Sequence, residues 1–168
     1  MVGCGSSTTT TVTVTVTTGS TATRTVTTTT TPTTPTPITI AWPPAGVGPD
    51  QTPVLRTPSG NIECVLQVEL GAVCVAHTHA WSVPPKPTSC EFDWTDGIVL
   101  GPTGRARFRC ASDIPFGPAN RYWPRTDLAY GASVIAGGVT CTSHADGLIC
   151  TNAAAHGFRL SRQRVAFF

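Results

Sequence analysis

After an amino-terminal stretch of different composition, apolar and polar residues alternate in short runs that turn residues separate. Residues 62–66 and 72–76 form two such runs around a reversal at 69–71, and each run carries one cysteine at its centre. Because successive side chains of a strand point to opposite faces, this period of two predicts a β-hairpin with Cys64 on one strand and Cys74 on the other.

The same plan recurs near the carboxyl end of the chain. Residues 138–141 and 148–150 are two short runs with one cysteine each, and Ala-Asp-Gly at 145–147 lies between them. Asp-Gly between such runs is a strong signal for a tight hairpin turn. We therefore expect a second hairpin, with Cys141 and Cys150 on its two strands.

A third pair of strands is expected between these hairpins. The run from Cys90 to Trp94 precedes Asp96-Gly97, which we predict to be a turn into residues 98–100. Proline-rich stretches at 84–87 and 116–124 predict loops, because proline breaks sheet ladders. Further on, three arginines alternate with three apolar residues: Arg105, Arg107 and Arg109 with Ala106, Phe108 and Cys110. This alternation predicts a half-buried strand with a basic outer face.

No window of the chain shows a helical period, so residues 53–168 predict an all-β fold, a small antiparallel domain built from hairpins. Six of the seven cysteines lie in this range, and an even set in a short, loop-rich domain predicts three disulfides formed in an oxidising compartment. Other pairings are possible, but paired strands bring neighbouring cysteines to bridging distance. A metal site is the alternative, although no C-x-x-C spacing occurs. The pairing that we expect is therefore sequential: Cys64–Cys74, Cys90–Cys110 and Cys141–Cys150.

The amino-terminal stretch lacks the residues of a packed core. Twenty of the thirty-two residues from Thr8 to Thr39 are threonine, and Arg24 is the only charged residue among them. So little apolar surface cannot offset the entropy of ordering the chain. Residues 8–52 therefore predict a disordered Thr/Pro-rich tether of the kind that carries O-linked sugars. A Thr-Val alternation at 11–18 has, taken alone, the period of a β-strand.

Residues 1–7, Met-Val-Gly-Cys-Gly-Ser-Ser, resemble the cleavage end of a bacterial lipoprotein signal, in which the cysteine becomes the first residue and carries lipid on its sulfur. Only three residues precede Cys4, so we expect the rest of the signal to be encoded upstream of Met1. This interpretation predicts lipidation of Cys4 and attachment to the outer side of the cell membrane. An ordinary unpaired thiol on a linker without an anchor is the alternative.

Charge and hydropathy exclude two classes of function. The net charge is +2, which is too small for the dense basic face of a nucleic-acid-binding protein. The sequence also lacks an apolar run of about eighteen residues, the length that a transmembrane helix requires.

Several short motifs together carry a resemblance to a known family. They are Pro-Ser-Gly-Asn-Ile-x-Cys at 58–64, Trp81 with a proline run, Cys-x-x-Asp-Trp at 90–94, Leu-Ala-Tyr-Gly at 128–131, Gly-Leu-Ile-Cys-Thr-Asn at 147–152, and His-Gly-Phe-x-Leu-Ser-Arg at 156–162. Over about residues 54–168 the chain resembles an uncharacterised domain family of actinobacterial secreted proteins and lipoproteins. The resemblance implies export and disulfides, and it supplies no catalytic residues.

Two pairs of side chains have the residue types of a chemical site. His77 and His79 are two apart, which on a strand puts both on one face, where they could ligate a metal ion. No carboxylate lies beside them in the sequence, so a polar loop is favoured and we expect no metal and no cofactor. Asp93 and Asp96 have the types needed for glycoside hydrolysis. Beside a turn, however, aspartate normally caps backbone groups.

A catalytic triad could be composed of Ser161, His156 and Asp146, because a serine, a histidine and an aspartate are the residue types that it needs. No Gly-x-Ser-x-Gly elbow or other local geometry supports one. For His156, a buried and hydrogen-bonded side chain that supports the final strand is the favoured interpretation. The sequence therefore predicts that the protein is not an enzyme.

The best candidate for a binding surface is a proline-rich loop. Trp123 lies there beside Tyr122, between Arg121 and Arg125, and aromatic side chains serve binding surfaces well. Trp94, in contrast, is expected in the core. The arginine stripe at 105–109 could meet an anionic polymer, although a solvated strand face is favoured.

These observations combine into one functional prediction. We expect an exported, lipid-anchored cell-envelope protein of unspecified function, a binding or structural module that contacts an envelope polymer or protein through loops such as 113–125. A secreted enzyme inhibitor is the alternative, and a small envelope hydrolase is the least favoured one.

Overall fold

The computed structural model describes residues 10–14, 24–28, 38–47, 52–67, 71–112 and 123–168. The chain divides into two compact units, Met1–Thr36 and Pro37–Phe168. In the first unit, β1 (Thr10–Val14) pairs antiparallel with β2 (Arg24–Thr28). Strand β1 contains the beginning of the predicted Thr-Val alternation. Cys4 lies outside the described residues, so its lipidation stays a prediction.

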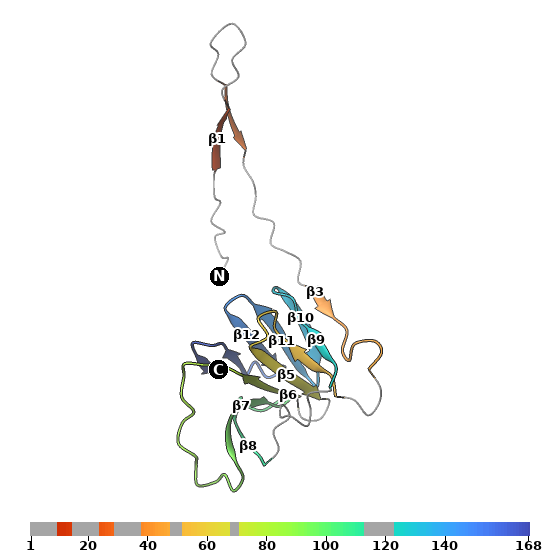
Figure 1. Ribbon diagram of the computed structural model, residues 1–168, viewed down its shortest axis with the longest axis vertical. Coiled ribbons are helices and arrows are strands. Elements are labelled where there is room, and N and C mark those ends of the chain that lie inside the picture. The colour runs from red at the N-terminus through yellow and green to blue at the C-terminus, as the bar shows by residue number, and fades with distance from the viewer. Residues whose placement is uncertain (1–9, 15–23, 29–37, 48–51, 68–70, 113–122) are drawn as a thin grey trace. The chain divides into compact units, whose positions relative to one another are not determined.

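The second unit contains two six-stranded sheets (Figure 1). Sheet I has the order β8-β7-β6-β5-β4-β9 and consists of β4 (Val54–Arg56), β5 (Ile62–Gln67), β6 (Gly71–Ala76), β7 (Trp94–Leu100), β8 (Arg107–Cys110) and β9 (Arg125–Asp127). Sheet II has the order β14-β13-β12-β11-β10-β3 and consists of β3 (Ile38–Ile40), β10 (Ala132–Ala136), β11 (Val139–His144), β12 (Gly147–Asn152), β13 (Gly157–Leu160) and β14 (Val165–Phe167). The described residues contain no helix, which confirms the predicted all-β fold.

Consecutive strands within each sheet pair antiparallel, whereas one edge of each sheet is a parallel pair. Strand β3 lies parallel to β10, and β9 lies parallel to β4. Because β3 joins sheet II, the compact unit begins at Pro37, inside the range 8–52 that the sequence assigns to the tether. Ile40 and Trp42 pack against the core, and the Trp42 indole N–H donates to the carbonyl of Leu66 at 3.3 Å.

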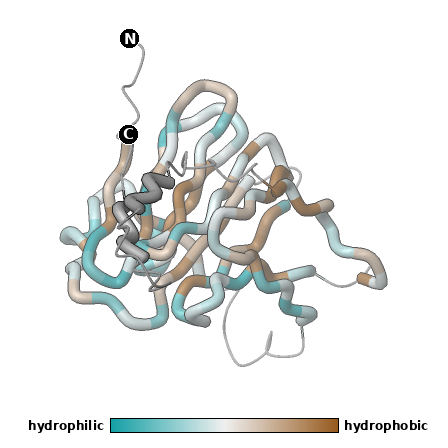
Figure 2. Tube along the Cα trace, turned by 90° about the horizontal axis from the view of Figure 1, so that it is seen from above, coloured by the Kyte–Doolittle hydropathy of each residue, from teal (hydrophilic) through white to brown (hydrophobic). Residues whose placement is uncertain are grey.

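The hydrophobic core lies between the two sheets, because the alternate residues of both sheets that face inward form one buried cluster. Hydrophobic residues follow the strands that cross the middle of this unit (Figure 2). The largest fully buried side chains of the cluster are Phe158, Leu55, Ile98, Leu100, Leu128, Leu148, Leu160, Val134 and Val139. At about 25 cal/mol per Å² of apolar area removed from water, burial of this set is a main stabilising contribution.

Both predicted hairpins are confirmed, and so is the sequential disulfide pairing. Cys64 lies directly opposite Cys74, and Cys141 directly opposite Cys150, each with 4.1 Å between the Cα atoms. The third disulfide joins Cys90, in the loop before β7, to Cys110 at the end of β8. All three therefore close locally, two of them between residues directly opposite each other on paired strands.

The predicted turn at Asp96-Gly97 is wrong. Both residues lie inside β7, and the pairing with β8 shifts register between Trp94 and Ile98, which marks a bulge. A Cβ on Gly97 would lie 3.2 Å from Oγ1 of Thr95 and 3.5 Å from Cβ of Arg109. The glycine therefore permits close packing in an irregular strand, where a β-bulge is a common setting for it.

A buried asparagine ties sheet II to a loop of sheet I. The Asn152 side-chain amide donates to the carbonyls of Gly101 and Gly104, in the loop after β7, at 2.9 and 2.8 Å. Its carbonyl oxygen accepts the backbone N–H groups of Ala154 and His156, both at 3.1 Å. With donors and acceptor all satisfied, this buried amide fixes the distance between the two sheets at the end where His156 lies.

Candidate functional site

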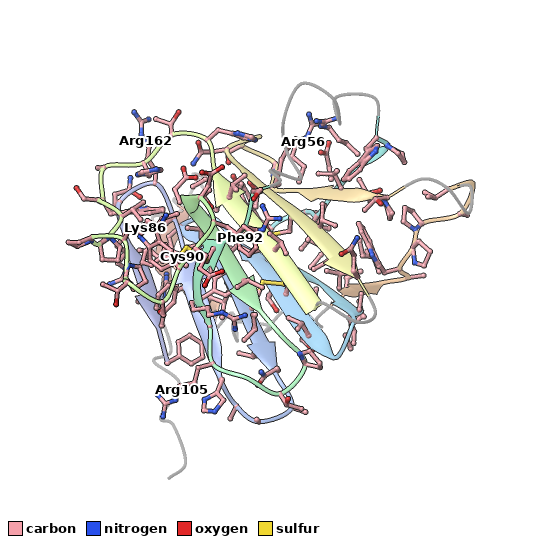
Figure 3. All side chains as sticks on the ribbon, turned by 90° about the horizontal axis from the view of Figure 1, so that it is seen from below. Arg56, Lys86, Cys90, Phe92, Arg105 and Arg162 are labelled. Atoms are coloured by element: carbon pink, nitrogen blue, oxygen red, sulfur yellow. A yellow bond between two sulfur atoms is a disulfide. The ribbon has the colours of Figure 1, made fainter. Side chains whose placement is uncertain are left out.

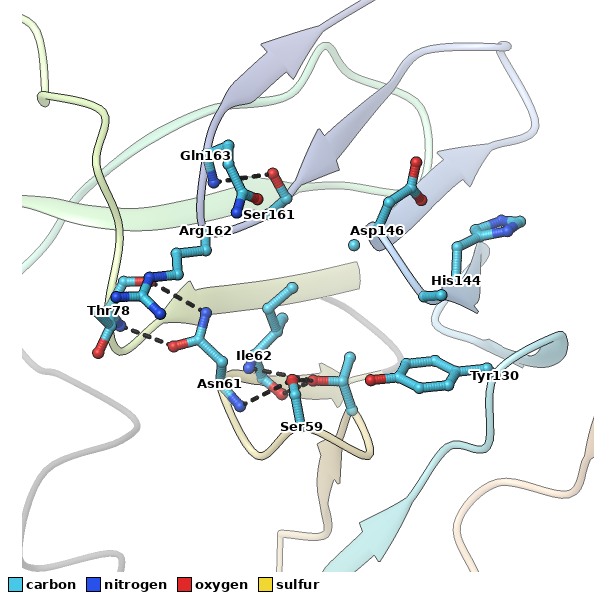
Figure 4. A pocket seen from close by; sticks show the side chains of 13 residues that line it. Ser59, Asn61, Ile62, Thr78, Tyr130, His144, Asp146, Ser161, Arg162 and Gln163 are labelled. Atoms are coloured by element: carbon cyan, nitrogen blue, oxygen red, sulfur yellow. Dashed lines mark hydrogen bonds between the residues drawn. The ribbon is translucent and has the colours of Figure 1, made fainter.

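A polar cleft of about 390 Å³ opens where five loops of the second unit meet (Figure 4). Its walls are the β4–β5 turn around Ser59, Thr78 after β6, Tyr130 before β10, the β11–β12 turn at 144–147 and the β13–β14 turn at 161–163. The volume falls in the range of roughly 300–1,000 Å³ that is usual for small-molecule sites. The cleft is therefore the candidate functional site.

The wall formed by sheet I is held by hydrogen bonds within and between loops. The side-chain amide of Asn61 donates to the carbonyl of Thr78 at 3.1 Å, and its oxygen accepts the N–H of Thr78 at 2.9 Å. The Ile62 N–H donates to Oγ1 of Thr57, and the Asn61 N–H donates to Oγ of Ser59. These polar groups are already engaged, so they shape the cleft and keep it rigid.

The wall formed by sheet II is a turn around Ser161. Its hydroxyl accepts the N–H groups of Gln163 and Arg164, at 3.2 and 3.1 Å, and is placed to donate to the Arg164 carbonyl at 3.2 Å. The Trp81 indole N–H donates to the Ser161 carbonyl at 2.9 Å, and the Ala80 N–H donates to the Arg162 carbonyl at 2.8 Å. The backbone that carries Arg162 is therefore fixed from two sides.

Five polar side chains in the cleft have no internal partner. Within the described residues, no hydrogen bond or ion pair is made by the side chains of Tyr130, His144, Arg162, Thr78 and Gln163, and all five are exposed. Asp146, the acid of the lining, is already paired with Arg159. The groups that remain for a ligand are thus a guanidinium, a phenol and an imidazole, together with a hydroxyl and a side-chain amide.

The three residues that have the types of a catalytic triad do not all lie in the cleft. Ser161 and Asp146 line it, and His156 does not. Strand β12 begins at Gly147, beside the cleft, and His156 follows the other end of that strand. His156 is half-buried instead of buried as expected, and its hydrogen bonds are made by its backbone, whose N–H donates to the Asn152 side chain and whose carbonyl accepts the Asn152 N–H.

Sequence reasoning missed the residues that do meet in the cleft. Tyr130, His144 and Arg162 each lie beside or within a short turn, where a polar side chain carries no signal of its own. The Asp146-Gly147 turn was predicted, but its spatial neighbours were not, because they come from both sheets. Only the arrangement of the loops reveals the site.

His77 and His79 do not form a common site in the structure. Nε2 of His77 lies 3.1 Å from Oε2 of Glu63, whereas Nε2 of His79 lies 3.2 Å from Oδ2 of Asp96. The His79 ring stacks on Trp81 at 3.8 Å between ring centroids. In the part of the chain that the structure describes, no three His, Cys, Asp or Glu side chains are grouped so that they could hold a metal ion.

The two aspartates that resemble a glycosidase pair have separate surroundings. Asp96 lies in β7 beside His79, while the backbone carbonyl of Asp93 accepts the N–H of Ala111 at 3.0 Å. Asp93 is exposed. The structure gives the two carboxylates no shared partner among the described residues.

The predicted binding loop is only partly described. Arg121 and Tyr122 lie outside the described residues, and Trp123 is half-buried. Nε of Arg125 lies 2.8 Å from Oε1 of Glu63, a buried carboxylate on the face of β5 that points away from the disulfides. Arg125 therefore has a structural partner, and its role in binding stays a prediction.

The other aromatic and basic predictions concern sheet I. Trp94 packs against the core, as expected, and its indole N–H donates to the carbonyl of Pro84 at 2.7 Å. Phe108 and Ala106 are buried while Arg105 and Arg107 are exposed, which confirms the predicted alternation over residues 105–108, whereas Arg109 and Cys110 are both half-buried. Figure 3 shows Arg56, Arg105 and Arg162 well apart on the second unit. These cations do not gather into a single basic patch.

An exposed ion pair fastens strand β9 to β4. Arg56 donates to Asp127 from Nε at 2.7 Å and from Nη2 at 3.3 Å, across a directly opposed pair of residues. These hydrogen bonds hold the pKa of Asp127 below its ordinary value of 3.8, and they raise the pKa of Arg56. The carboxylate is thus stabilised in its charged form in the folded state.

This shift predicts a pH-dependent contribution to stability. A carboxyl group whose pKa is lower in the folded state stabilises the fold above its unfolded pKa, and the effect disappears as pH falls through the folded pKa. We expect Asp127→Asn to lower stability slightly at about pH 6 and to have no effect in strong acid, well below the ordinary value of 3.8. Urea unfolding of wild type and variant at the two pH values measures the difference in their free energies of unfolding. An equal difference at both pH values would contradict the prediction.

The described residues contain no helix that is long and apolar enough to cross a membrane. No curated protein matches the chain, and no solved structure matches it. The sequence profile of a family of unknown function, DUF6636, does match it, over residues 36–168. This range contains both sheets and every loop of the cleft. The chain therefore belongs to the DUF6636 family.

Proposed function

We propose that this protein is an exported cell-envelope protein, anchored through lipid on Cys4, whose β domain binds an envelope component in the cleft. The observation that carries the proposal is the set of three disulfides that cross-link the domain. Disulfides of this kind form and persist in oxidising compartments outside the cytoplasm. A threonine-rich stretch between Cys4 and the domain gives the domain reach from a membrane surface.

Binding without catalysis is favoured by the state of the hydroxyl groups in the cleft. Thr57, Ser59 and Ser161 all use their side-chain oxygens within turns. A serine nucleophile needs a neighbouring base within hydrogen-bond reach, and no hydroxyl of the described cleft residues is hydrogen-bonded to a histidine. A rigid lining with five uncommitted polar side chains suits recognition instead.

The proposal is tested by expressing the full-length gene in its native host, with Cys4→Ser as the matched variant. We expect the wild-type protein in the membrane fraction and the variant in the medium. Intact mass should show a lipid adduct on Cys4, and reduction should add about 6 Da, because each disulfide takes up two hydrogens. A cytoplasmic protein with free thiols would overturn export, and wild-type protein without the adduct would overturn the anchor.

A further inference from the structure

We propose that the cleft recognises an acidic oligosaccharide, as in an acidic envelope glycan, with Arg162 holding the carboxylate of one sugar unit and Tyr130, on the opposite side of the cleft, supporting the ring of another. This inference rests on the proposed function and adds the chemical class of the ligand. It follows from the charge of the cleft, from the nature of its aromatic side chain and from the rigidity of its walls.

The charge of the cleft favours an anion. Arg162 has no ion pair among the described residues, and the acid of the lining, Asp146, is neutralised by Arg159. The other titratable side chains of the lining, His144 and Tyr130, carry no carboxylate. The guanidinium is therefore the one uncompensated charge in the described lining. Its planar fork of N–H donors matches the two oxygens of a carboxylate.

The position of Arg162 is fixed before a ligand arrives. Its own carbonyl accepts the Ala80 N–H at 2.8 Å, and the residue before it is held by Trp81 and by the Ser161 turn. Trp81 itself packs against the core. Only the side chain of Arg162 must be ordered on binding, and a preorganised site of this kind loses less entropy when it binds.

Tyr130 supplies an aromatic surface on the opposite side of the cleft from this charge (Figure 4). Its side chain is 49% exposed, and it points across the cleft toward the turn that contains Ser59 (Figure 4). A tyrosine offers an apolar ring together with a polar hydroxyl. The C–H face of a sugar ring can pack on such a ring while the phenol bonds a sugar hydroxyl. A small inorganic anion would use Arg162 and leave Tyr130 without a role.

The test is to measure the affinity of the full-length protein for short oligogalacturonates and glucuronate-containing oligosaccharides by isothermal titration calorimetry. Their methyl esters are the matched probes, because esterification removes the charge and keeps the sugar. We expect binding of an acidic oligosaccharide, and about a tenfold or greater loss of affinity on esterification, as for the removal of a charge-assisted hydrogen bond. Equal binding of acid and ester would overturn carboxylate recognition.

The matched protein variants are Arg162→Gln and Arg105→Gln, which remove the same charge at two separate exposed places (Figure 3). Arg162→Gln should weaken binding about tenfold or more, Arg162→Lys should weaken it less, and Arg105→Gln should not change it. Tyr130→Ala should also weaken binding, with an unchanged melting temperature. An acidic oligosaccharide that binds all variants equally would place the site elsewhere and overturn the inference.

Two further probes separate failure of this inference from failure of the proposed function. Inorganic phosphate and a peptide with a free carboxyl terminus test the other anions that a guanidinium accepts. If either binds at Arg162 while no acidic oligosaccharide does, the sugar class is wrong. Protein that sediments with isolated native cell envelopes but binds no acidic oligosaccharide would likewise overturn only this inference. Protein that binds neither would overturn both.

Discussion

Full reduction of the three disulfides is expected to unfold the β domain at neutral pH without denaturant. The disulfides close loops of 10, 20 and 9 residues, and in the chain-entropy model each contributes roughly 2.5–3.5 kcal/mol. Their sum of about 8 kcal/mol compares with a total stability of about 5–15 kcal/mol for a typical domain. Near-ultraviolet circular dichroism and tryptophan fluorescence, before and after reduction, measure the loss.

The order of reduction should follow burial. Cys64, Cys74, Cys141 and Cys150 are 0–1% exposed, so a reductant reaches them only when the hairpins open. The Cys90–Cys110 disulfide lies nearer the surface, since Cys90 is 6% exposed and Cys110 is half-buried. We expect this disulfide to react first, as mass spectrometry after alkylation would show.

Cys4→Ser is the control for the disulfide experiment, because it removes a thiol outside the domain and should leave the response unchanged. A cooperative thermal transition that survives complete reduction and alkylation would contradict the prediction. It would also mean that the core between the sheets suffices alone, and the disulfides would then add little to the argument for export.

The local parts of the fold could be predicted from the sequence, because the residues that determine them lie close together in the chain. The hairpin around Asp146-Gly147 needs only a turn with a glycine and two alternating runs. Gly147 has a φ of 142°, and a Cβ there would lie 2.5 Å from the Leu160 carbonyl oxygen, so only glycine fits. The same signal misled at Asp96-Gly97, because the Gly97 backbone is not in the left-handed region and the glycine serves packing in a bulged strand.

The parallel edges and the cleft could not be predicted, because both join segments far apart in the chain. Nothing in Ile38-Thr39-Ile40 indicates that it pairs with β10, about ninety residues later. Likewise Tyr130 and Arg162 are unremarkable turn residues until two sheets bring their loops together. The predicted binding loop around Trp123 drew on composition alone, and composition carries no information on which side chains already have partners.

Arg125→Ala is expected to destabilise the domain by about 3 kcal/mol, because it leaves a buried carboxylate without its main partner. The Glu63 side chain is 7% exposed, with Oε1 2.8 Å from Arg125 and Oε2 3.1 Å from His77. Its neighbours on the same face of sheet I are the buried Val65 and Val75 and, directly opposite on β4, Arg56. We place the effect at the low end of the range for a broken buried pair because the Arg125 side chain is 28% exposed and His77 remains.

The matched variant is the double substitution Glu63→Leu with Arg125→Leu. Replacement of both members of a buried ion pair by apolar residues is often neutral, so the double variant should be more stable than Arg125→Ala. Urea unfolding of wild type, both single variants and the double variant gives the coupling energy between the two residues. Arg125→Ala with wild-type stability and lost affinity for isolated envelopes would contradict this structural role. That outcome would restore Arg125 to the binding surface that the sequence predicts around Trp123.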